Sequence, residues 1–234
     1  MDDTKVAIVT ASGRGMGAGI AKELHSQGYK LSLMSPSGAS EQLAKDLGCV
    51  GITGSVTDQS KIKLLVDKTM ETYGRIDGVV NHTGHPPKGE LLEISDEDWH
   101  LGLDMMLLNV VRMTRLVTPI MLRQGGGAIV NISTFATFEP EELFPVSVCI
   151  RAGLSGFTKI YADKYAKSGI RMNNILPGFI DSLPEIEEMR TRIPMGRYGT
   201  VQEISKTAAF LLSVDASYIT GQNIRVDGGL TRHV

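Results

Sequence analysis

The chain has 234 residues, of which 42% are hydrophobic and 21% are charged. This composition suits one globular domain over residues 1–234, large enough to bury about 70% of the surface that the unfolded chain exposes. A net charge of −2 gives no electrostatic case for binding nucleic acid or an anionic membrane. The short acidic N-terminus is not a signal peptide, and no apolar run reaches the ~18 residues of a membrane span.

The cysteine and histidine content narrows the class of protein further. Two cysteines, Cys49 and Cys149, make no disulfide framework, so the expected location is a reducing cytoplasm. The five histidines show no metal-ligand spacing, and we therefore predict no metal site.

Short apolar runs and stripes of helical spacing alternate along the chain. The runs predict strands over 6–10, 30–35, 49–53, 76–81, 128–133, 170–176 and 223–226. The stripes predict helices over 16–27, 40–47, 59–73, 97–123 (one long helix or two in succession), 146–167 and 201–213. The helix over 97–123 is apolar almost all round and is expected to be buried.

This alternation predicts an α/β fold in which helices cover both faces of a parallel sheet. Right-handed crossovers then give a Rossmann-type, doubly wound sheet of seven strands. No repeat, low-complexity tract or Pro/Gly linker divides the chain. The irregular stretch 179–199 is the candidate for a lid over a substrate.

The first predicted strand runs through a glycine-rich turn into the first helix. Gly13, Gly15 and Gly17 keep side chains away from the N-terminus of that helix. Such a terminus offers unpaired N–H groups and the positive end of the helix dipole, so a pyrophosphate can bind there. Because the turn follows a strand and opens a helix, it predicts a dinucleotide site. The alternative is an ordinary tight turn.

The segment after the second predicted strand indicates which dinucleotide binds. An NAD site of this type places a carboxylate there for the ribose 2′-hydroxyl, but the chain reads Met34-Ser35-Pro36-Ser37-Gly38. Ser35 and Ser37 offer hydroxyls, and Arg14 projects from the glycine turn. A cation with hydroxyls matches a 2′-phosphate, which favours NADP(H) over NAD(H). The alternative is a surface ion pair of Arg14 beside an ordinary turn.

Several motifs, in one order along the whole chain, resemble those of the classical short-chain dehydrogenases/reductases. Within this family, the motif pattern is most similar to that of the 3-oxoacyl-(acyl-carrier-protein) reductases. Thr10–Gly17 resembles the family's T-G-x-x-x-G-x-G, with Ala11 in place of the first glycine. The other matching segments are Asn81-His82-Thr83-Gly84, Ile129–Ser133, Pro177-Gly178, Gly221-Gln222 and Val226–Gly229. The resemblance implies a small-molecule substrate and a homotetramer, or at least a homodimer.

The same resemblance implies which residues line the cofactor site. These are Thr10, Ser12, Arg14, Gly15, Met16, Ser35, Ser37, Val56, Asn81, Gly84, Arg151, Pro177 and Gly178. The expected cofactor is NADP(H).

The catalytic positions that the resemblance implies are all occupied by other residue types. In the family a tyrosine exchanges the proton, a lysine four residues later binds the ribose, an earlier serine holds the substrate oxygen, and an asparagine supports a water relay. The family's Y-x-x-x-K-A-G aligns with Ser147–Gly153, which puts Ser147 at the tyrosine and Arg151 at the lysine. The serine position falls on Thr134 and the asparagine position on Met106.

These replacements have unequal chemical consequences. Thr134 keeps a hydroxyl, and Arg151 keeps a positive charge that can bind ribose but cannot release a proton. Ser147 is the severe change, because its hydroxyl is shorter and a much weaker acid than a phenol of pKa about 10. Met106 cannot hold the relay water.

Two other groups are candidates for the missing proton donor. His85 follows the Asn81–Gly84 motif and ordinarily titrates near neutrality. Glu139, with its neighbours Glu141 and Glu142, follows the fifth strand, where a carboxylic acid of raised pKa could protonate an oxygen. In each case the alternative is a solvated loop residue. Cys149 and Tyr198 are expected to serve packing.

Three functions follow from this combination. The first is an NADP(H)-dependent oxidoreductase of a carbonyl or alcohol with a relocated proton donor. The second is a non-redox enzyme on the same scaffold, such as a lyase or dehalogenase. Halohydrin dehalogenases carry arginine at the lysine position, but they keep the serine and tyrosine and lack the nucleotide-binding glycines, the reverse of this chain. The third is a catalytically inactive nucleotide-binding subunit.

Overall fold

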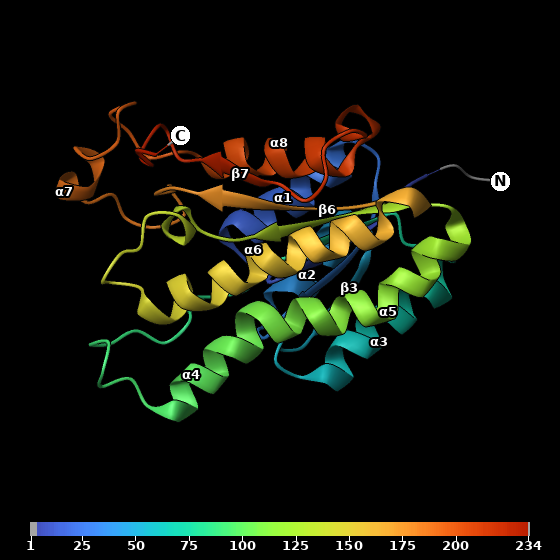
Figure 1. Cartoon of the computed structure of the whole chain (residues 1–234). Coiled ribbons are helices and arrows are strands. Elements are labelled where there is room, and N and C mark those ends of the chain that lie inside the picture. The colour runs from blue at the N-terminus through green and yellow to red at the C-terminus, as the bar shows by residue number, and fades with distance from the viewer. Residues whose placement is uncertain (1–3, 234) are drawn as a thin grey trace.

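The computed structural model describes residues 4–233. Seven strands form one sheet in the order β3-β2-β1-β4-β5-β6-β7, and all neighbouring strands are parallel. Helices cover both faces of this sheet (Figure 1). The predicted α/β, doubly wound architecture is therefore confirmed.

Every predicted strand and helix is present, with ends that differ by no more than two residues. The strands are β1 Val6–Thr10, β2 Lys30–Ser35, β3 Val50–Thr53, β4 Gly78–Asn81, β5 Gly127–Ile132, β6 Ile170–Pro177 and β7 Asn223–Val226. The helices are α1 Gly15–Ser26, α2 Ala39–Leu47, α3 Gln59–Tyr73, α4 Asp96–Leu103, α5 Asn109–Gln124, α6 Pro145–Tyr165, α7 Glu187–Arg190 and α8 Val201–Leu212. Short helical turns are η1 Asp104–Leu108, η2 Phe135–Thr137, η3 Ala166–Ser168 and η4 Val214–Ala216.

Two apolar layers hold the helices to the sheet. Helices α1, α2 and α8 pack on one face, and α3, α5 and α6 pack on the other. Helix α3 shows how the sequence produces this arrangement. The Asp58 carboxylate caps it by accepting from the N–H groups of Ser60 and Lys61, and Gly74 ends it in the left-handed conformation. Its apolar stripe, which includes Ile62 and Leu65, is buried against the sheet.

The long helix predicted over 97–123 is divided by a π-helical turn. This turn, η1, separates α4 from α5 and contains the buried Met106. The stretch is buried only in part, because Leu101 and Leu122 are 42% and 43% exposed. The stretch Asp96–Gln124 is long and apolar enough to cross a membrane by length and composition, but half of its most apolar window is buried. It covers one face of the sheet, as core helices do.

Four asparagines in register form what we call the amide ladder across β4–β7. The Nδ2 of Asn81 donates to Asn131 Oδ1 at 2.8 Å, and Asn131 Nδ2 donates to Asn174 Oδ1 at 2.9 Å. Asn174 Nδ2 in turn donates to Asn223 Oδ1 at 2.8 Å. The Thr158 hydroxyl of α6 also donates to Asn174 Oδ1. The ladder satisfies polar groups that would otherwise destabilise a buried sheet.

The ladder predicts a non-additive effect on stability. Asn131→Val should lower the free energy of unfolding by about 2 kcal/mol, because the buried Asn81 amide then lacks its acceptor. Asn81→Val should have a similar cost, since it leaves Asn131 Oδ1 unpaired. The double variant should cost less than the sum of the two singles, because neither orphaned group remains. Urea denaturation measures all three values, and strictly additive losses would contradict the ladder as a coupled network.

Candidate functional site

The turn between β1 and α1 is shaped for close approach of a ligand to the backbone. A Cβ on Gly17 would lie 2.2 Å from the carbonyl oxygen of Ala11, so any side chain there would displace the turn. Ala11 itself has φ 48°, a left-handed conformation that costs an L-residue about 1–2 kcal/mol. The first turn of α1 contains no acidic residue, and the side chain of its N-cap residue Arg14 does not cap the helix. The N–H groups at this end remain directed outward.

Arg14 and Ser37 are exposed at this turn, whereas Ser35 is buried. The Ser35 hydroxyl donates to the Ser37 carbonyl at 2.9 Å. It also lies against Gly13, where an added Cβ would come within 2.8 Å of Ser35 Oγ. Ser35 therefore shapes the turn. The side chains of Arg14 and Ser37 are the ones available to contact a ligand. Among the described residues Arg14 has no side-chain hydrogen bond or ion pair.

Thr10 and Ser12 are also committed to hydrogen bonds within the fold. The Thr10 hydroxyl donates to the His82 carbonyl at 2.7 Å and accepts from the His82 N–H at 2.9 Å. The Ser12 hydroxyl donates to the Met34 carbonyl at 3.4 Å. These bonds fix the start of the glycine turn against β4 and β2. Thr10 and Ser12 thus serve the site by positioning its backbone.

The remaining predicted cofactor residues lie at the carboxyl ends of the strands, at the left in Figure 1. Asn81 ends β4, Gly84 is exposed just beyond it, and Pro177 ends β6. Gly178 follows, and its N–H donates to the Val226 carbonyl at 3.0 Å. Met16 in the first turn of α1 and Val56 after β3 are half-buried. Parallel strands bring these separate loops to a single edge, where ligands of open α/β sheets bind.

Arg151 is a buried cation at the centre of this edge. It is 7% exposed, and its Nη1 donates to the Ile132 carbonyl at the end of β5. Burial lowers the pKa of Arg151 to about 10, so the guanidinium stays charged at neutral pH. Ser147 lies one turn earlier on the same face of α6 and is 8% exposed. The arrangement provides a fixed positive charge beside a hydroxyl, and it provides no phenol.

Thr134 lies directly after β5 and begins the turn η2. Its hydroxyl accepts from the Ala136 N–H at 3.4 Å, and the side chain is half-buried. The neighbouring Ser133 hydroxyl is 3.3 Å from that of Thr137. The acceptor bond to Ala136 leaves the Thr134 O–H hydrogen available to a ligand.

His85 is partly covered by its surroundings, and this partial burial, followed by Lys88, Arg151 and Arg14, lowers its pKa. Because these three cations act on one imidazole, the loop that carries His85 faces the positively charged edge of the sheet. At pH 7 the imidazole is neutral. His85 is therefore suited to accept a hydrogen bond or proton there, rather than to act as a strong acid.

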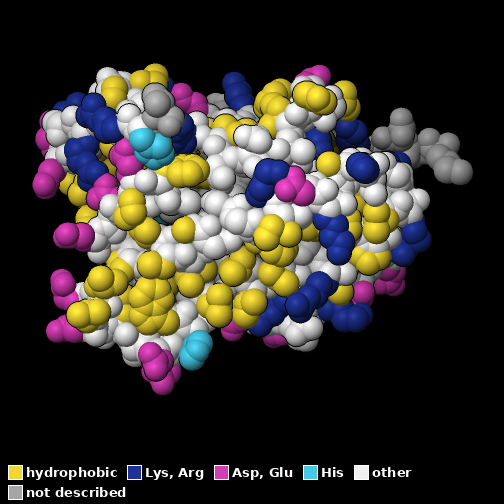
Figure 2. All heavy atoms as spheres, viewed as in Figure 1, with side chains coloured by type: hydrophobic (Ala, Val, Ile, Leu, Met, Phe, Trp, Pro, Cys, Tyr) yellow, Lys and Arg dark blue, Asp and Glu magenta, His cyan; other side chains and the backbone are white. Residues whose placement is uncertain are grey.

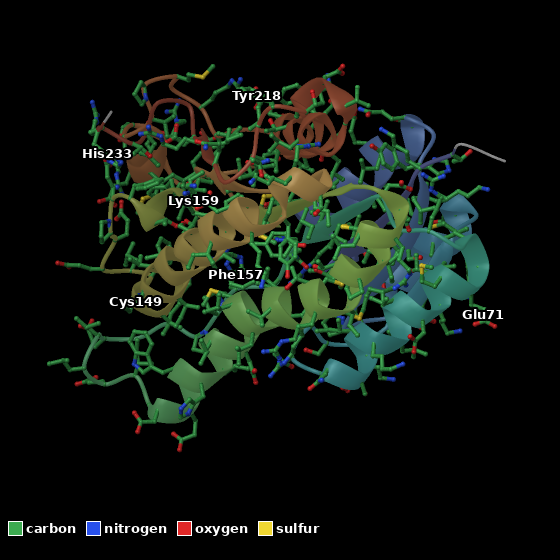
Figure 3. The ribbon with its side chains drawn as sticks, turned by 45° about the vertical axis from the view of Figure 1, so that its right-hand side comes forward. Glu71, Cys149, Phe157, Lys159, Tyr218 and His233 are labelled. Carbon is green, nitrogen blue, oxygen red and sulfur yellow. The ribbon has the colours of Figure 1, made fainter. Side chains whose placement is uncertain are left out.

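The surroundings of Glu139 do not favour it as a proton donor. Its carboxylate accepts hydrogen bonds from the N–H groups of Arg232 and His233, and these bonds lower its pKa. The carboxylate is thus ionised and fastens the C-terminal segment, where Figure 3 shows His233. Glu141 is bound to Arg192 of the segment 179–199. These carboxylates brace the loop before α6 rather than serving the substrate.

Tyr198 and Cys149 were both expected to serve packing, and only Tyr198 does so. Tyr198 is 6% exposed, and its ring stacks on that of Phe179 with centroids 5.5 Å apart. Cys149 points away from the Ser147–Arg151 face as expected, but it is exposed on α6 and fills no core (Figure 3).

Two residues of the site were not predicted from the sequence, His82 and Asn109. Both have a buried side-chain atom without a hydrogen-bond partner among residues 4–233, namely His82 Nδ1 and Asn109 Oδ1. Burial, with smaller effects of Arg151 and His85, lowers the pKa of His82 to about 3. The available signal was the histidine in Asn81-His82-Thr83-Gly84, a polar ring where the family has a second asparagine.

Comparisons with known proteins agree with this geometry. A family model described as enoyl-(acyl carrier protein) reductase matches residues 10–231. The 3-oxoacyl-(acyl-carrier-protein) reductase FabG of Staphylococcus aureus is 34% identical over 98% of this chain and 99% of its own length. FabG of Thermotoga maritima is 38% identical over 75% of this chain and 74% of its own length. Oxidoreductase UcpA of Salmonella typhimurium is 34% identical over 97% and 94% of the two chains.

A solved structure shows the same fold. The L-sorbose reductase of Gluconobacter frateurii, in complex with NADPH and L-sorbose, superposes with a TM-score of 0.92 and 25% sequence identity. The match covers 99% of this chain and 98% of that chain. With the family model and the relatives above, it places the whole described fold among known reductases. The chain belongs to the short-chain dehydrogenase/reductase family of oxidoreductases and is similar throughout to its 3-oxoacyl-(acyl-carrier-protein) reductases.

Proposed function

We propose that the protein is an NADP(H)-dependent oxidoreductase of a small carbonyl or alcohol compound, with a proton donor other than tyrosine. The observation that carries this proposal is the open N-terminus of α1. Its glycines admit a pyrophosphate, and Arg14 is exposed beside it without a partner among the described residues. No carboxylate stands after β2 to select a free ribose hydroxyl. These features fit an adenosine 2′-phosphate.

Cofactor selection by Arg14 can be measured directly. Arg14→Gln should raise the Kd for NADPH about tenfold, because a charge-assisted hydrogen bond to the 2′-phosphate is lost. The Kd for NADH should change less than twofold. Fluorescence titration of both nucleotides gives these values. Arg123→Gln, at an exposed arginine near the end of α5, is the matched control. Equal weakening of both nucleotides would remove Arg14 from 2′-phosphate recognition, and a wild type that binds neither would refute the cofactor assignment.

The residues around Arg151 support hydride chemistry in a particular way. NADPH, when bound, supplies the hydride that reduces a carbonyl carbon. We propose that the hydroxyls of Thr134 and Ser147 donate hydrogen bonds to the carbonyl oxygen, and that Arg151 binds the cofactor's ribose, from where its fixed charge stabilises the negative charge developing on that oxygen. Because neither Arg151 nor a serine hydroxyl is a good acid at neutral pH, the proton comes from solvent. The segment 179–199, braced through Arg192 and Glu141, is the proposed lid.

The catalytically inactive nucleotide-binding subunit stays a second candidate, since the nucleotide turn is intact while Ser147 occupies the tyrosine position. Restoring the family's pair should distinguish the two. Ser147→Tyr/Arg151→Lys should raise kcat at least tenfold with a 3-oxoacyl thioester or a ketose, because a phenol returns as general acid. Oxidation of NADPH at 340 nm measures the rate, and Arg151→Lys alone is the control.

The outcomes of this experiment distinguish the three candidate functions. Measurable turnover by the wild type, increased in the double variant, supports the oxidoreductase. A wild type that binds NADPH but never oxidises it with any carbonyl compound supports the inactive subunit. A folded wild type that binds no nucleotide favours the non-redox enzyme.

We also propose a homo-oligomer in which a second copy covers the exposed apolar groove between α5 and α6. The groove has a volume of about 430 Å³ and is lined by apolar and aromatic side chains that include Leu122, Phe157 and Ile160. Ile160 is 70% exposed, and Figures 2 and 3 show apolar side chains along this face. Packing the same two helices of another copy against it gives an isologous four-helix contact.

The oligomer proposal is tested by charge at the groove. Ile160→Glu should reduce the solution mass to a lower multiple of 25.3 kDa, because a carboxylate buried in an apolar contact is strongly destabilising. Light scattering after size exclusion measures the mass. Leu64→Glu, at an exposed leucine of α3, is the control and should leave the mass unchanged. A wild-type monomer at micromolar concentration would exclude the assembly.

A cytoplasmic location is proposed on the state of the two cysteines. Cys49 and Cys149 are both free, and Cys149 is exposed. An exposed free thiol is typical of proteins in a reducing compartment.

A further inference from the structure

A small polar cavity lies behind Arg151, between the ends of β4 and β5, the turn η1 and helix α6. Its lining includes His82, Met106, Asn109 and Arg151. The cavity volume is about 10 Å³, which is the space needed by the centre of one water molecule. The cavity lies on the inner side of the site, next to the first amide of the ladder, Asn81.

Several residues that line this cavity carry a buried polar atom without a hydrogen-bond partner among the described residues. Within residues 4–233, four buried side-chain nitrogen or oxygen atoms lack a hydrogen-bond partner. Three of them, His82 Nδ1, Asn109 Oδ1 and Arg151 Nε, belong to residues that line the cavity. An unsatisfied buried polar group is destabilising. Because the three residues line one small cavity, one bound molecule could satisfy all three atoms.

The donors and acceptors of this set match one water molecule. The Nε–H of Arg151 is a donor. Asn109 presents an acceptor, because its Nδ2 is already used in donating to the Met105 carbonyl. His82 is neutral, and with its proton on Nε2 it presents Nδ1 as a second acceptor. A water can accept from Arg151 and donate to Asn109 and His82, which uses both of its hydrogens.

The π-helical turn is the reason why Asn109 reaches this cavity. It includes Met106, the position at which the family has its asparagine, and Asn109 follows it directly as the first residue of α5. Met106 and Asn109 both line the cavity, but only Asn109 brings a polar atom. The second acceptor, His82, comes from the turn after β4. This chain thus builds the polar lining from positions different from those of its relatives.

We propose that this cavity binds one structural water, and that His82 and Asn109 are positioning residues that hold the Arg151 guanidinium through it. The contact of Arg151 Nη1 with the Ile132 carbonyl and the water on Nε fix two edges of the guanidinium. The guanidinium is then held in one orientation for contact with a ligand at this edge of the sheet. This last step rests on the proposed nucleotide site, whereas the water site does not.

Two measurements on the unliganded wild type test the water site. A crystal structure at better than about 1.8 Å should show one ordered water within hydrogen-bond distance of the three atoms. In ¹H–¹⁵N spectra, one arginine Nε–H should exchange slowly at pH 7 and show a cross-peak to water, and it should be absent from Arg151→Lys. A dry cavity, or a direct bond from Arg151 Nε to either neighbour, would overturn the proposal.

Variants test the positioning role. Asn109→Leu should expel the water, shift or broaden the Arg151 Nε–H signal, and raise the Kd for NADPH about tenfold through loss of a charged group's hydrogen bond. His82→Leu should do the same. Met106→Leu, which alters only apolar lining, should change neither the signal nor the Kd by more than twofold. Unchanged NADPH affinity in folded Asn109→Leu and His82→Leu would refute the positioning role. A wild type that binds no NADPH would refute the proposed function and leave the spectral and crystallographic tests of the water decisive.

Discussion

The register of β4 to β7 is the constraint on which the site depends, and the amide ladder enforces it. Asn81, Asn131, Asn174 and Asn223 are direct neighbours across the sheet, and the amides of the first three each donate toward β7. A slip by one residue would turn every amide to the opposite face and leave it unpaired. Aligned amides also polarise one another in a buried setting. The ladder lies at the end of β4 and one residue before the end of β5, so it sets where His82 and Thr134 leave the sheet.

Binding and chemistry are separable at this edge because they depend on different physical properties. Ligand binding needs outward N–H groups and positive charge, which the α1 turn, Arg14 and Arg151 provide. Proton transfer needs a group whose pKa lies near the working pH. Burial brings the pKa of Arg151 to about 10 and that of His82 to about 3, so neither changes protonation state near neutrality. The charge of the buried part of the site therefore stays constant around pH 7.

Local patterns predicted the fold and the nucleotide turn because their causes are local. The apolar spacing of α3 and the glycines before α1 act within a few residues of themselves. Glu139 could not be assigned in this way, since the N–H groups that bind it belong to Arg232 and His233, more than ninety residues away. The exposure of Cys149 and the burial of His82 likewise depend on which helices meet α6 and β4. The π-helical turn has no sequence signature comparable to a cap, so the sequence left open whether this stretch forms one long helix or two in succession.

The π-helical turn and the loss of the family's asparagine are physically connected. At position 106 a methionine fills apolar space, and the polar group moves to Asn109, where the wider turn ends. Arg151 occupies more volume than lysine, and its guanidinium brings donors in a fixed plane rather than one rotating ammonium. A planar cation needs partners at defined edges; the Ile132 carbonyl is one of them, and the proposed water would be the second. His82, Asn109 and Arg151, which look independent in the sequence, thus line one cavity as a polar cluster around a different cation. Such a cluster is better suited to holding an anionic ligand in place than to exchanging a proton with it.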